Sequence, residues 1–181
     1  MRFIETLNGI RHDPPPILIM RQAGRYLPEY KQVRQTTPDF ISFCLNPEKA
    51  TEVTLQPIRR YGFDASIIFS DILLIPWAMS RNVRFIPGQG PVLDKLSSVK
   101  DIEIYADTNL TKKYEAVGEA VHNTRKHLPE DTALIGFSGA PWTLMTYLFE
   151  GGSSRDFATT KSYPWSNPDE AVAIIDILVE K

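Results

Sequence analysis

The sequence is poor in cysteine and lacks long hydrophobic runs. Cys44 is the only cysteine among 181 residues, so no internal disulfide can form, and no histidine lies near it at a spacing typical of zinc sites. Apolar stretches such as Ile17–Met20 are too short to span a bilayer. The pattern of a secretory leader, a charged start followed by an apolar segment, is not seen in the sequence. We therefore expect a soluble protein of a reducing, cytoplasmic compartment.

An excess of charge of either sign is also missing. Lysine and arginine total 20 against 22 acidic residues, a formal net charge of -2. Such a balance gives no general attraction to nucleic acid or to anionic membranes, so we expect neither as a partner. An anionic ligand would need a local positive site. The hydrophobic fraction of 43% is typical of a globular protein, and the length favours one domain.

Short β-rich runs alternate with helical stretches, which predicts an α/β fold with parallel strands. The three strand candidates are nearly continuous in apolar residues, as expected for strands buried on both faces. They are Ile17–Met20, Ala65–Phe69 and Ala133–Phe137. The segments 14–16 and 86–91 are rich in proline and glycine and are expected to form turns.

Three helices are predicted from their starts and their apolar spacing. Asn46-Pro47-Glu48 and Asn167-Pro168-Asp169 each combine an N-cap residue, a proline at the first helical position and an acid in the first turn. Pro57 lies inside the first of these helices and is expected to kink it or end it early. The middle helix is expected to carry Tyr114, Val117, Val121 and Leu128 on one face, and the last helix to run through Val172, Ile174, Ile175, Leu178 and Val179.

In parallel α/β folds, functional side chains gather just beyond the carboxyl ends of the strands. Arg21 and Arg25 follow the first strand candidate, and their forked guanidinium groups suit a ligand with several carboxylates; surface arginines in ordinary ion pairs are the alternative. Asp71 follows the second strand and either meets a ligand N–H group or caps the next helix. Tyr147 follows the third and is either a site residue or a core tyrosine with one hydrogen-bond partner.

Other motifs carry less chemistry. The segment Gly151–Ser154 lacks the strand-to-helix context of a phosphate-binding loop. The residues His12, His122 and His127 form neither a zinc-like cluster nor a catalytic triad with serine and aspartate, and we interpret them as solvated.

Several blocks of sequence resemble the N-terminal half of the uroporphyrinogen decarboxylase family. The blocks are Met20–Tyr30, Leu55–Tyr61, Ile68–Leu73 and Gly136–Leu144, followed by Tyr147 and Glu150–Gly152. The resemblance implies a (β/α)8 TIM barrel, incomplete in this chain and occupying residues 1–181 as a partial barrel domain. It also implies a homodimer without cofactor or metal, which converts uroporphyrinogen III to coproporphyrinogen III by removing four acetate carboxyls.

Carried over position by position, the resemblance implies catalytic roles for Asp71, Arg21 and Arg25. The substrate-binding residues that it implies are Arg21, Gln22, Ala23, Gly24, Arg25, Phe40, Asp71 and Tyr147. A serine and a histidine that the family contributes from later strands have no counterpart here, so we expect the chain to be incomplete for activity. Two alternatives remain open, namely a cobalamin-linked methyltransferase of the same superfamily and a non-catalytic assembly module.

Overall fold

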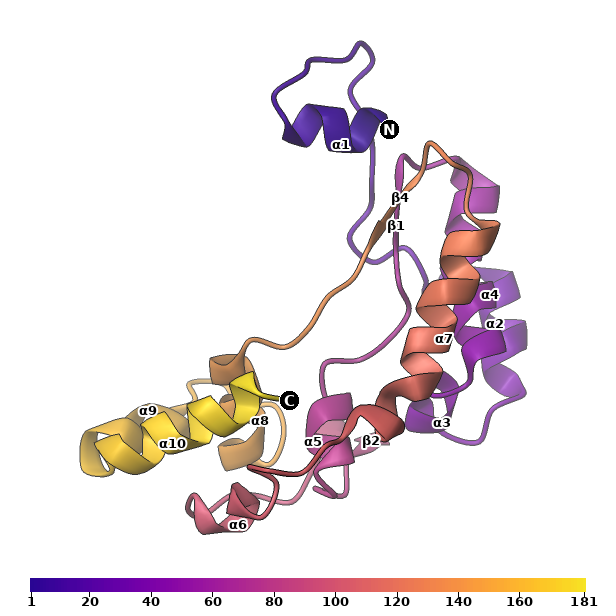
Figure 1. Ribbon diagram of the computed structural model, residues 1–181. Helices are drawn as coiled ribbons and strands as arrows, with labels where there is room; N and C mark the ends of the chain where they lie inside the picture. The colour runs from indigo at the N-terminus through magenta and orange to yellow at the C-terminus, as the bar shows by residue number, and fades with distance from the viewer. The chain divides into compact units, whose positions relative to one another are not determined.

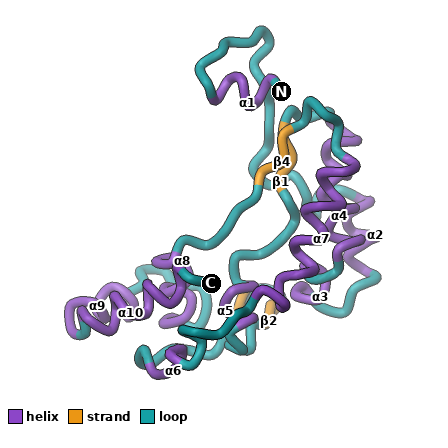
Figure 2. Tube along the Cα trace, in the orientation of Figure 1, coloured by secondary structure: helices purple, strands orange, loops and turns teal.

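Two parallel strands lie side by side in the computed structural model, which describes residues 1–181 (Figure 2). Strand β1 (Ala65–Ile67) pairs with β4 (Ala133–Ile135), with Ala65 opposite Ala133. Both strand predictions are therefore confirmed, although each strand ends two residues early. The reason is clear for β1, because the N–H of Phe69 donates to Thr54 Oγ1 (2.9 Å) on a helix rather than to a neighbouring strand.

The contacts within the chain divide it into two units. The first contains residues 1–70 and 114–137, and the second contains residues 71–113 and 138–181. The first unit holds β1, β4 and the helices α1 (Arg2–Leu7), α2 (Pro28–Gln35), α3 (Phe40–Cys44), α4 (Pro47–Tyr61) and most of α7 (Thr111–His127) (Figure 1). A single domain over residues 1–181 stays a prediction.

Helix α4 organises the core of the first unit. It begins as predicted, with the Asn46 side chain accepting a hydrogen bond from the N–H of Lys49 (2.9 Å). The expectation that Pro57 would end it early is wrong, because the helix continues to Tyr61 and ends at Gly62 in a left-handed conformation. All residues from Val53 to Ile58 are buried, so packing offsets the hydrogen bond that proline cannot donate.

Three clusters of buried side chains surround this helix. The first joins α4 to α2 and α3. The second joins it to β4 and to the segment after α7, and the third joins it to α7 and to the segment after β1. Their members are Leu27, Tyr30, Phe43 and Val53; Leu55, Ile58, Phe63 and Leu128; and Ala50, Ile68 and Ala120.

The predicted strand at Ile17–Met20 is wrong. Its one main-chain pairing is the N–H of Asp64 donating to the carbonyl of Ile17 (3.0 Å), while the N–H of Ile17 donates to the Asp64 side chain (2.7 Å). Ile17, Ile19 and Met20 are also exposed, by 58%, 49% and 81%. A short apolar run can thus have the composition of a buried strand and still lie outside the sheet with most of its side chains in solvent.

The predicted face of one helix needs correction as well. On α7 the buried residues are Ala120 and Thr124, whereas Val121 is exposed. On α10 (Pro168–Val179) Ile174 and Leu178 are buried, whereas Val172 and Val179 are exposed. The remaining buried residues of α10 are Ala171 and Ile177.

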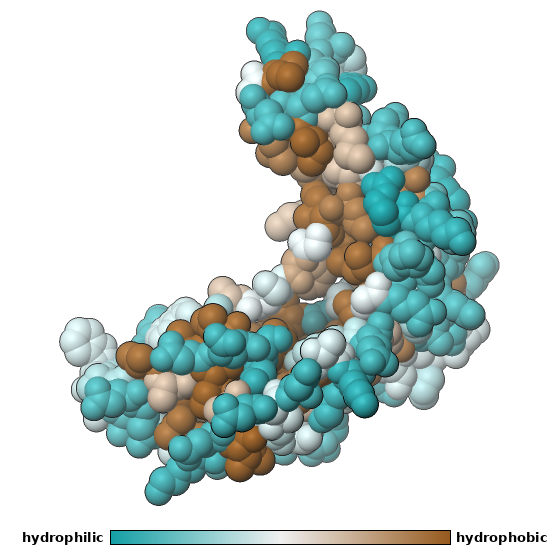
Figure 3. All heavy atoms as spheres, in the orientation of Figure 1, coloured by the Kyte–Doolittle hydropathy of each residue, from teal (hydrophilic) through white to brown (hydrophobic).

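The second unit is a hairpin with helices. Strands β2 (Arg84–Ile86) and β3 (Gly90–Val92) are antiparallel, and residues 87–89 connect them; the turn predicted at 86–91 is present but shorter, because its ends belong to the strands. The helices are α5 (Leu74–Ala78), α6 (Lys100–Glu103), α8 (Pro141–Glu150), α9 (Ala158–Ser166) and α10. Figure 3 shows hydrophobic side chains gathered over the layer formed by α8, α9 and α10.

The glycines after α8 serve close packing. Gly151 ends the helix with a φ of 72°, and Gly152 bridges to Val92 of the hairpin. A Cβ atom on Gly152 would lie 2.6 Å from the carbonyl oxygen of Pro91, so only glycine fits there. By contrast, Gly118 in the middle of α7 has open space around it.

No helix is both long and apolar enough to cross a membrane.

Candidate active site

The segment between Met20 and α2 is attached to β1 through a buried side chain. Gln22 is 2% exposed, and its amide nitrogen donates to the carbonyl of Ala65 (2.6 Å) while its amide oxygen accepts from the N–H of Ile67 (3.0 Å). The glutamine amide therefore takes the place of a neighbouring strand. Its predicted substrate contact stays a prediction, and its side-chain amide is already engaged with the sheet.

Arg21 and Arg25 are exposed on either side of this buried anchor. The segment forms turns rather than a helix, with the N–H of Leu27 donating to the carbonyl of Gly24 (3.0 Å). Neither guanidinium group takes part in a hydrogen bond or an ion pair, unlike Arg59 and Arg60, which pair with acids on the same unit. The alternative of two arginines in ordinary surface ion pairs therefore does not hold.

Two further predicted residues pack beside this segment. Ala23 and Phe40 both lie against the cluster of Leu27, Tyr30, Phe43 and Val53. The Phe40 ring meets that of Phe69 edge-on, with 5.9 Å between the centroids. The first unit therefore brings Arg21–Arg25 and Phe40 to one region around an aromatic core.

Asp71 opens the second unit in a tight turn. Its Oδ1 accepts a hydrogen bond from the N–H of Leu73 (2.8 Å), and its other carboxylate oxygen makes no hydrogen bond. The aspartate thus closes a turn ahead of α5, but it is not the N-cap of that helix, a position held by Leu73. Burial raises the pKa of the Asp71 carboxyl, and the bond from Leu73 opposes this rise. A carboxylate in this position gains from any further N–H or cationic partner.

Tyr147 lies on α8 and is partly buried. Its hydroxyl makes no hydrogen bond, so the alternative of a core tyrosine with one partner does not describe it. The side chain lines a cavity of about 290 Å³ within the second unit.

The loop after β4 packs against the segment that carries Asp71. A Cβ atom on Gly139 would lie 2.6 Å from a methyl carbon of Leu144 and 3.2 Å from Cβ of Ile72. The second unit therefore holds Asp71 and Tyr147 on neighbouring segments, although no hydrogen bond joins them. Because Arg21, Arg25 and Phe40 belong to the first unit, a pocket common to all these residues stays a prediction.

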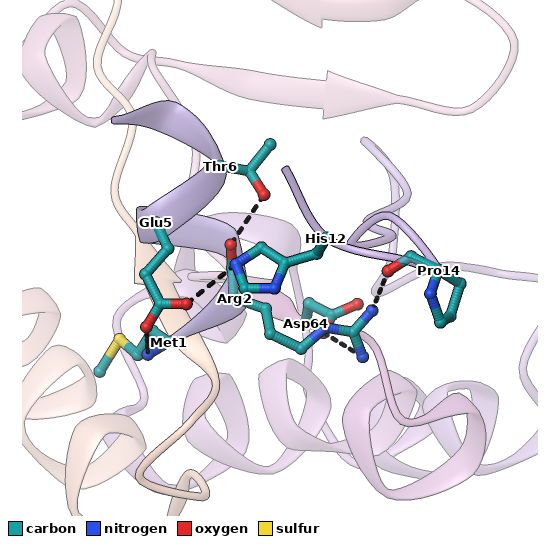
Figure 4. Close-up of polar contacts among 7 residues, drawn as sticks. All are labelled: Met1, Arg2, Glu5, Thr6, His12, Pro14 and Asp64. Atoms are coloured by element: carbon teal, nitrogen blue, oxygen red, sulfur yellow. Dashed lines mark hydrogen bonds and ion pairs between the residues drawn. The ribbon is translucent and has the colours of Figure 1, made fainter. Parts of the chain in front are cut away.

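The histidines take part in local contacts rather than in a metal site. His12 Nε2 lies 2.9 Å from Glu5 Oε2, in a cluster where Arg2 also contacts Asp64 and the carbonyl of Pro14 (Figure 4). The side chain of His12 is 22% exposed and is therefore less solvated than expected. Within either unit, no three histidine, cysteine or acidic side chains gather closely enough to hold a metal ion.

Two further residues that line the cavity beside Tyr147 were not predicted from the sequence. These are Phe157 and Lys161, at and after the start of α9. Helix α9 has no regular apolar spacing and contains Pro164, so periodicity could not predict it. The polar stretch from Ser153 to Asp156 ahead of it is the one available sign of a helix start.

Comparison with known proteins is decisive for the family. The family model for uroporphyrinogen decarboxylase matches residues 1–181, the whole chain. The chain belongs to the uroporphyrinogen decarboxylase family. It is 49% identical over 177 residues to the uroporphyrinogen decarboxylase of Rhodospirillum rubrum, and 51% identical over 179 residues to that of Caulobacter vibrioides.

The match covers nearly all of this chain and half of its relatives. It includes 98% of the chain and 51% of the Rhodospirillum rubrum protein, and 99% and 50% for Caulobacter vibrioides. A methyltransferase from Methanosarcina mazei superposes with a TM-score of 0.74, over 99% of this chain and 51% of its own. At 16% identity that likeness shows the fold alone. The fold is thus α/β and corresponds to half of a TIM barrel, and the sequence identities favour the decarboxylases over the methyltransferase alternative.

Proposed function

We propose that this chain supplies the part of a uroporphyrinogen decarboxylase site that holds the substrate carboxylates and the centre of the macrocycle. The reaction is the removal of four acetate carboxyls from uroporphyrinogen III to give coproporphyrinogen III. The observation that carries the proposal is the pair of unpaired arginines, Arg21 and Arg25, on a segment anchored by Gln22 in a chain of this family.

The residue types suit this chemistry. Each acetate arm is a carboxylate, and an arginine can bind it through two parallel N–H bonds at any working pH. Two such groups would fix the arm so that its C–C bond lies in position for cleavage. Because neither arginine has a partner within the chain, a carboxylate could bind both guanidinium groups without breaking an existing ion pair.

Asp71 suits the step that follows. Protonation of the pyrrole carbon beside the arm gives a cationic ring, which accepts the electron pair of the breaking C–C bond as CO2 leaves. A partly buried carboxylate whose pKa is raised by desolvation interacts most favourably with a neighbour that becomes positively charged. Asp71 would therefore stabilise the cationic intermediate more than the neutral substrate. Tyr147, with a free hydroxyl, would contact the substrate beside it.

We further propose that the chain requires a polypeptide equivalent to the other half of its relatives for turnover, since it spans about half of their length. A homodimeric, cytoplasmic enzyme that needs neither cofactor nor metal is the expected context, by analogy with the family.

The test is a chimera. Residues 1–181 are joined to the part of the Rhodospirillum rubrum relative that follows the matched region, and conversion of uroporphyrinogen III is followed by chromatography of the oxidised products. We expect turnover by the chimera and little CO2 release by the chain alone. Comparable turnover by the chain alone would overturn the need for a second half. A folded but inactive chimera would overturn the catalytic role and favour a non-catalytic assembly module.

Substitutions in the chimera test the individual roles. Arg21→Ala and Arg25→Ala should each lower kcat/KM by about tenfold or more, and Asp71→Asn by about a hundredfold. Arg59→Ala is the matched control, because Arg59 is an exposed arginine of the same unit that pairs with Glu52 (2.6 Å), and its activity should stay within about twofold.

A further inference from the structure

A cavity between α8 and the start of α9 lies wholly within the second unit. Its volume is about 290 Å³. This is the lower end of the range of about 300–1,000 Å³ that is typical of small-molecule pockets, so the cavity can take a part of a tetrapyrrole and not the macrocycle. Its walls combine three aromatic side chains with three polar ones, namely Trp142, Tyr147 and Phe157 with Thr143, Thr146 and Lys161.

Lys161 is an unpaired cation beside this cavity. Its ammonium group makes no hydrogen bond or ion pair within the chain, which is also true of other exposed lysines such as Lys112, but Lys161 lines the cavity and Lys112 does not. The hydroxyl of Tyr147 is unpaired as well. A cation and a hydroxyl donor from two different helices therefore line one cavity, which is the combination that a carboxylate accepts from.

An unusual backbone turn holds Lys161 in this place. Phe157 has a φ of 55° and a ψ of 38°, a left-handed conformation that is rare for a bulky residue and is often found at functional sites. Its N–H donates to Ser154 Oγ (3.2 Å), and its carbonyl accepts from the N–H of Lys161 (2.9 Å). Because the two residues are one helical turn apart, both side chains lie on the same face and reach the same cavity.

We propose that this cavity binds one carboxylate arm of the substrate, with Lys161 as the cationic contact. The identity of the ligand rests on the proposed function. The aromatic walls would pack against the methylene groups and the ring edge, while Lys161 and Tyr147 would hold the carboxylate. Lys161 is accordingly a binding residue that selects for the charge and length of an arm.

The test is a fluorescence titration of the 181-residue chain with uroporphyrin III, a stable oxidised stand-in for the substrate. We expect Lys161→Met to weaken binding by about fivefold, as for the loss of one partly exposed charge pair, and Lys161→Arg to retain it within about twofold. Lys112→Met is the matched control, since Lys112 is an exposed lysine of the same unit that does not line the cavity, and it should bind as the unsubstituted chain does. The loss caused by Lys161→Met should shrink in high salt.

Equal affinity of the Lys161→Met and Lys112→Met variants would overturn the inference, and so would the absence of uroporphyrin binding by the unsubstituted chain. Circular dichroism of each variant excludes unfolding as the cause. In the chimera, Lys161→Met should raise KM for uroporphyrinogen III with little change in kcat. If the chimera is active and Lys161→Met leaves its KM unchanged, the role of Lys161 is refuted and the proposed function stands. If the chimera is inactive but Lys161→Met still weakens uroporphyrin binding to the chain, the catalytic proposal is refuted and the binding role of Lys161 stands.

Discussion

Replacement of Gln22 by methionine tests whether its side chain stands in for a strand. Methionine has a similar length and volume but can neither donate to the carbonyl of Ala65 nor accept from the N–H of Ile67. Each buried main-chain group left without a partner lowers the free energy of unfolding by about 1–3 kcal/mol. Part of this loss is offset, because a buried methionine has no polar amide that must be removed from water. The free energy of unfolding should therefore fall by about 2–4 kcal/mol.

Gln56→Met provides the matched control. Gln56 is buried to a similar degree, at 4% exposed, but its amide nitrogen bonds only to the Glu52 side chain and its amide oxygen has no partner. Its loss should cost less than about 1 kcal/mol. In urea denaturation, with a slope of about 2 kcal/mol per molar, the Gln22 variant should shift the midpoint by about 1–2 M and the control by less than about 0.5 M. Equal shifts for the two variants would refute the reasoning.

Three further sets of substitutions probe helix caps, close packing and a partly buried charge. Asn46→Ala should cost about 1 kcal/mol in urea denaturation, and Asn167→Ala much less, because only the first side chain caps its helix; equal costs would contradict this. Gly152→Ala should cost several kcal/mol through its collision with main chain, while Gly118→Ala should add about 1 kcal/mol of stability at an open helix site. Asp71→Asn should raise stability at neutral pH, because a carboxyl whose folded pKa is raised loses stability as pH rises through that pKa. The gain should vanish in unfolding measurements below the pKa of an unfolded aspartate, and a gain that persists there would point to another cause.

The strands and helix starts that were predicted correctly depend on local chemistry. Ala65–Ile67 and Ala133–Ile135 are mostly apolar and are buried or partly buried, and Asn46 caps α4 through its own side chain. The run at Ile17–Met20 has the same apolar character, yet most of its residues are exposed. Sequence alone could not separate these cases, since pairing at an edge is decided by partners distant in the chain.

The faces of the helices were harder to predict than their starts. Val121 and Val172 fit a helical stripe but are exposed, while the small residues Ala120 and Ala171 are buried. Close approach between elements selects for small side chains, which a count of large apolar residues overlooks. Helix α9 was missed because its start depends on the left-handed turn at Phe157, for which the sequence has no glycine signal.

The predicted site residues were identified by resemblance and by their place after strands, and the structure adds their local environments. It shows that Arg21 and Arg25 are unpaired and that Asp71 is a turn former with a raised pKa. Neither property could be read from spacing, because each depends on the absence of nearby partners in three dimensions. The role of Lys161 lay outside the reach of sequence for the same reason.

Position 22 is constrained by folding, whereas the nearby positions 21 and 25 are not. Asparagine would be one methylene too short to reach both β1 groups, and glutamate would lack the donor for Ala65, so folding leaves little freedom at position 22. Positions 21 and 25 carry no such obligation, because neither guanidinium group makes a hydrogen bond or an ion pair within the chain. Under the proposed function, changes there would alter the affinity for a carboxylate without removing a hydrogen bond that the fold needs.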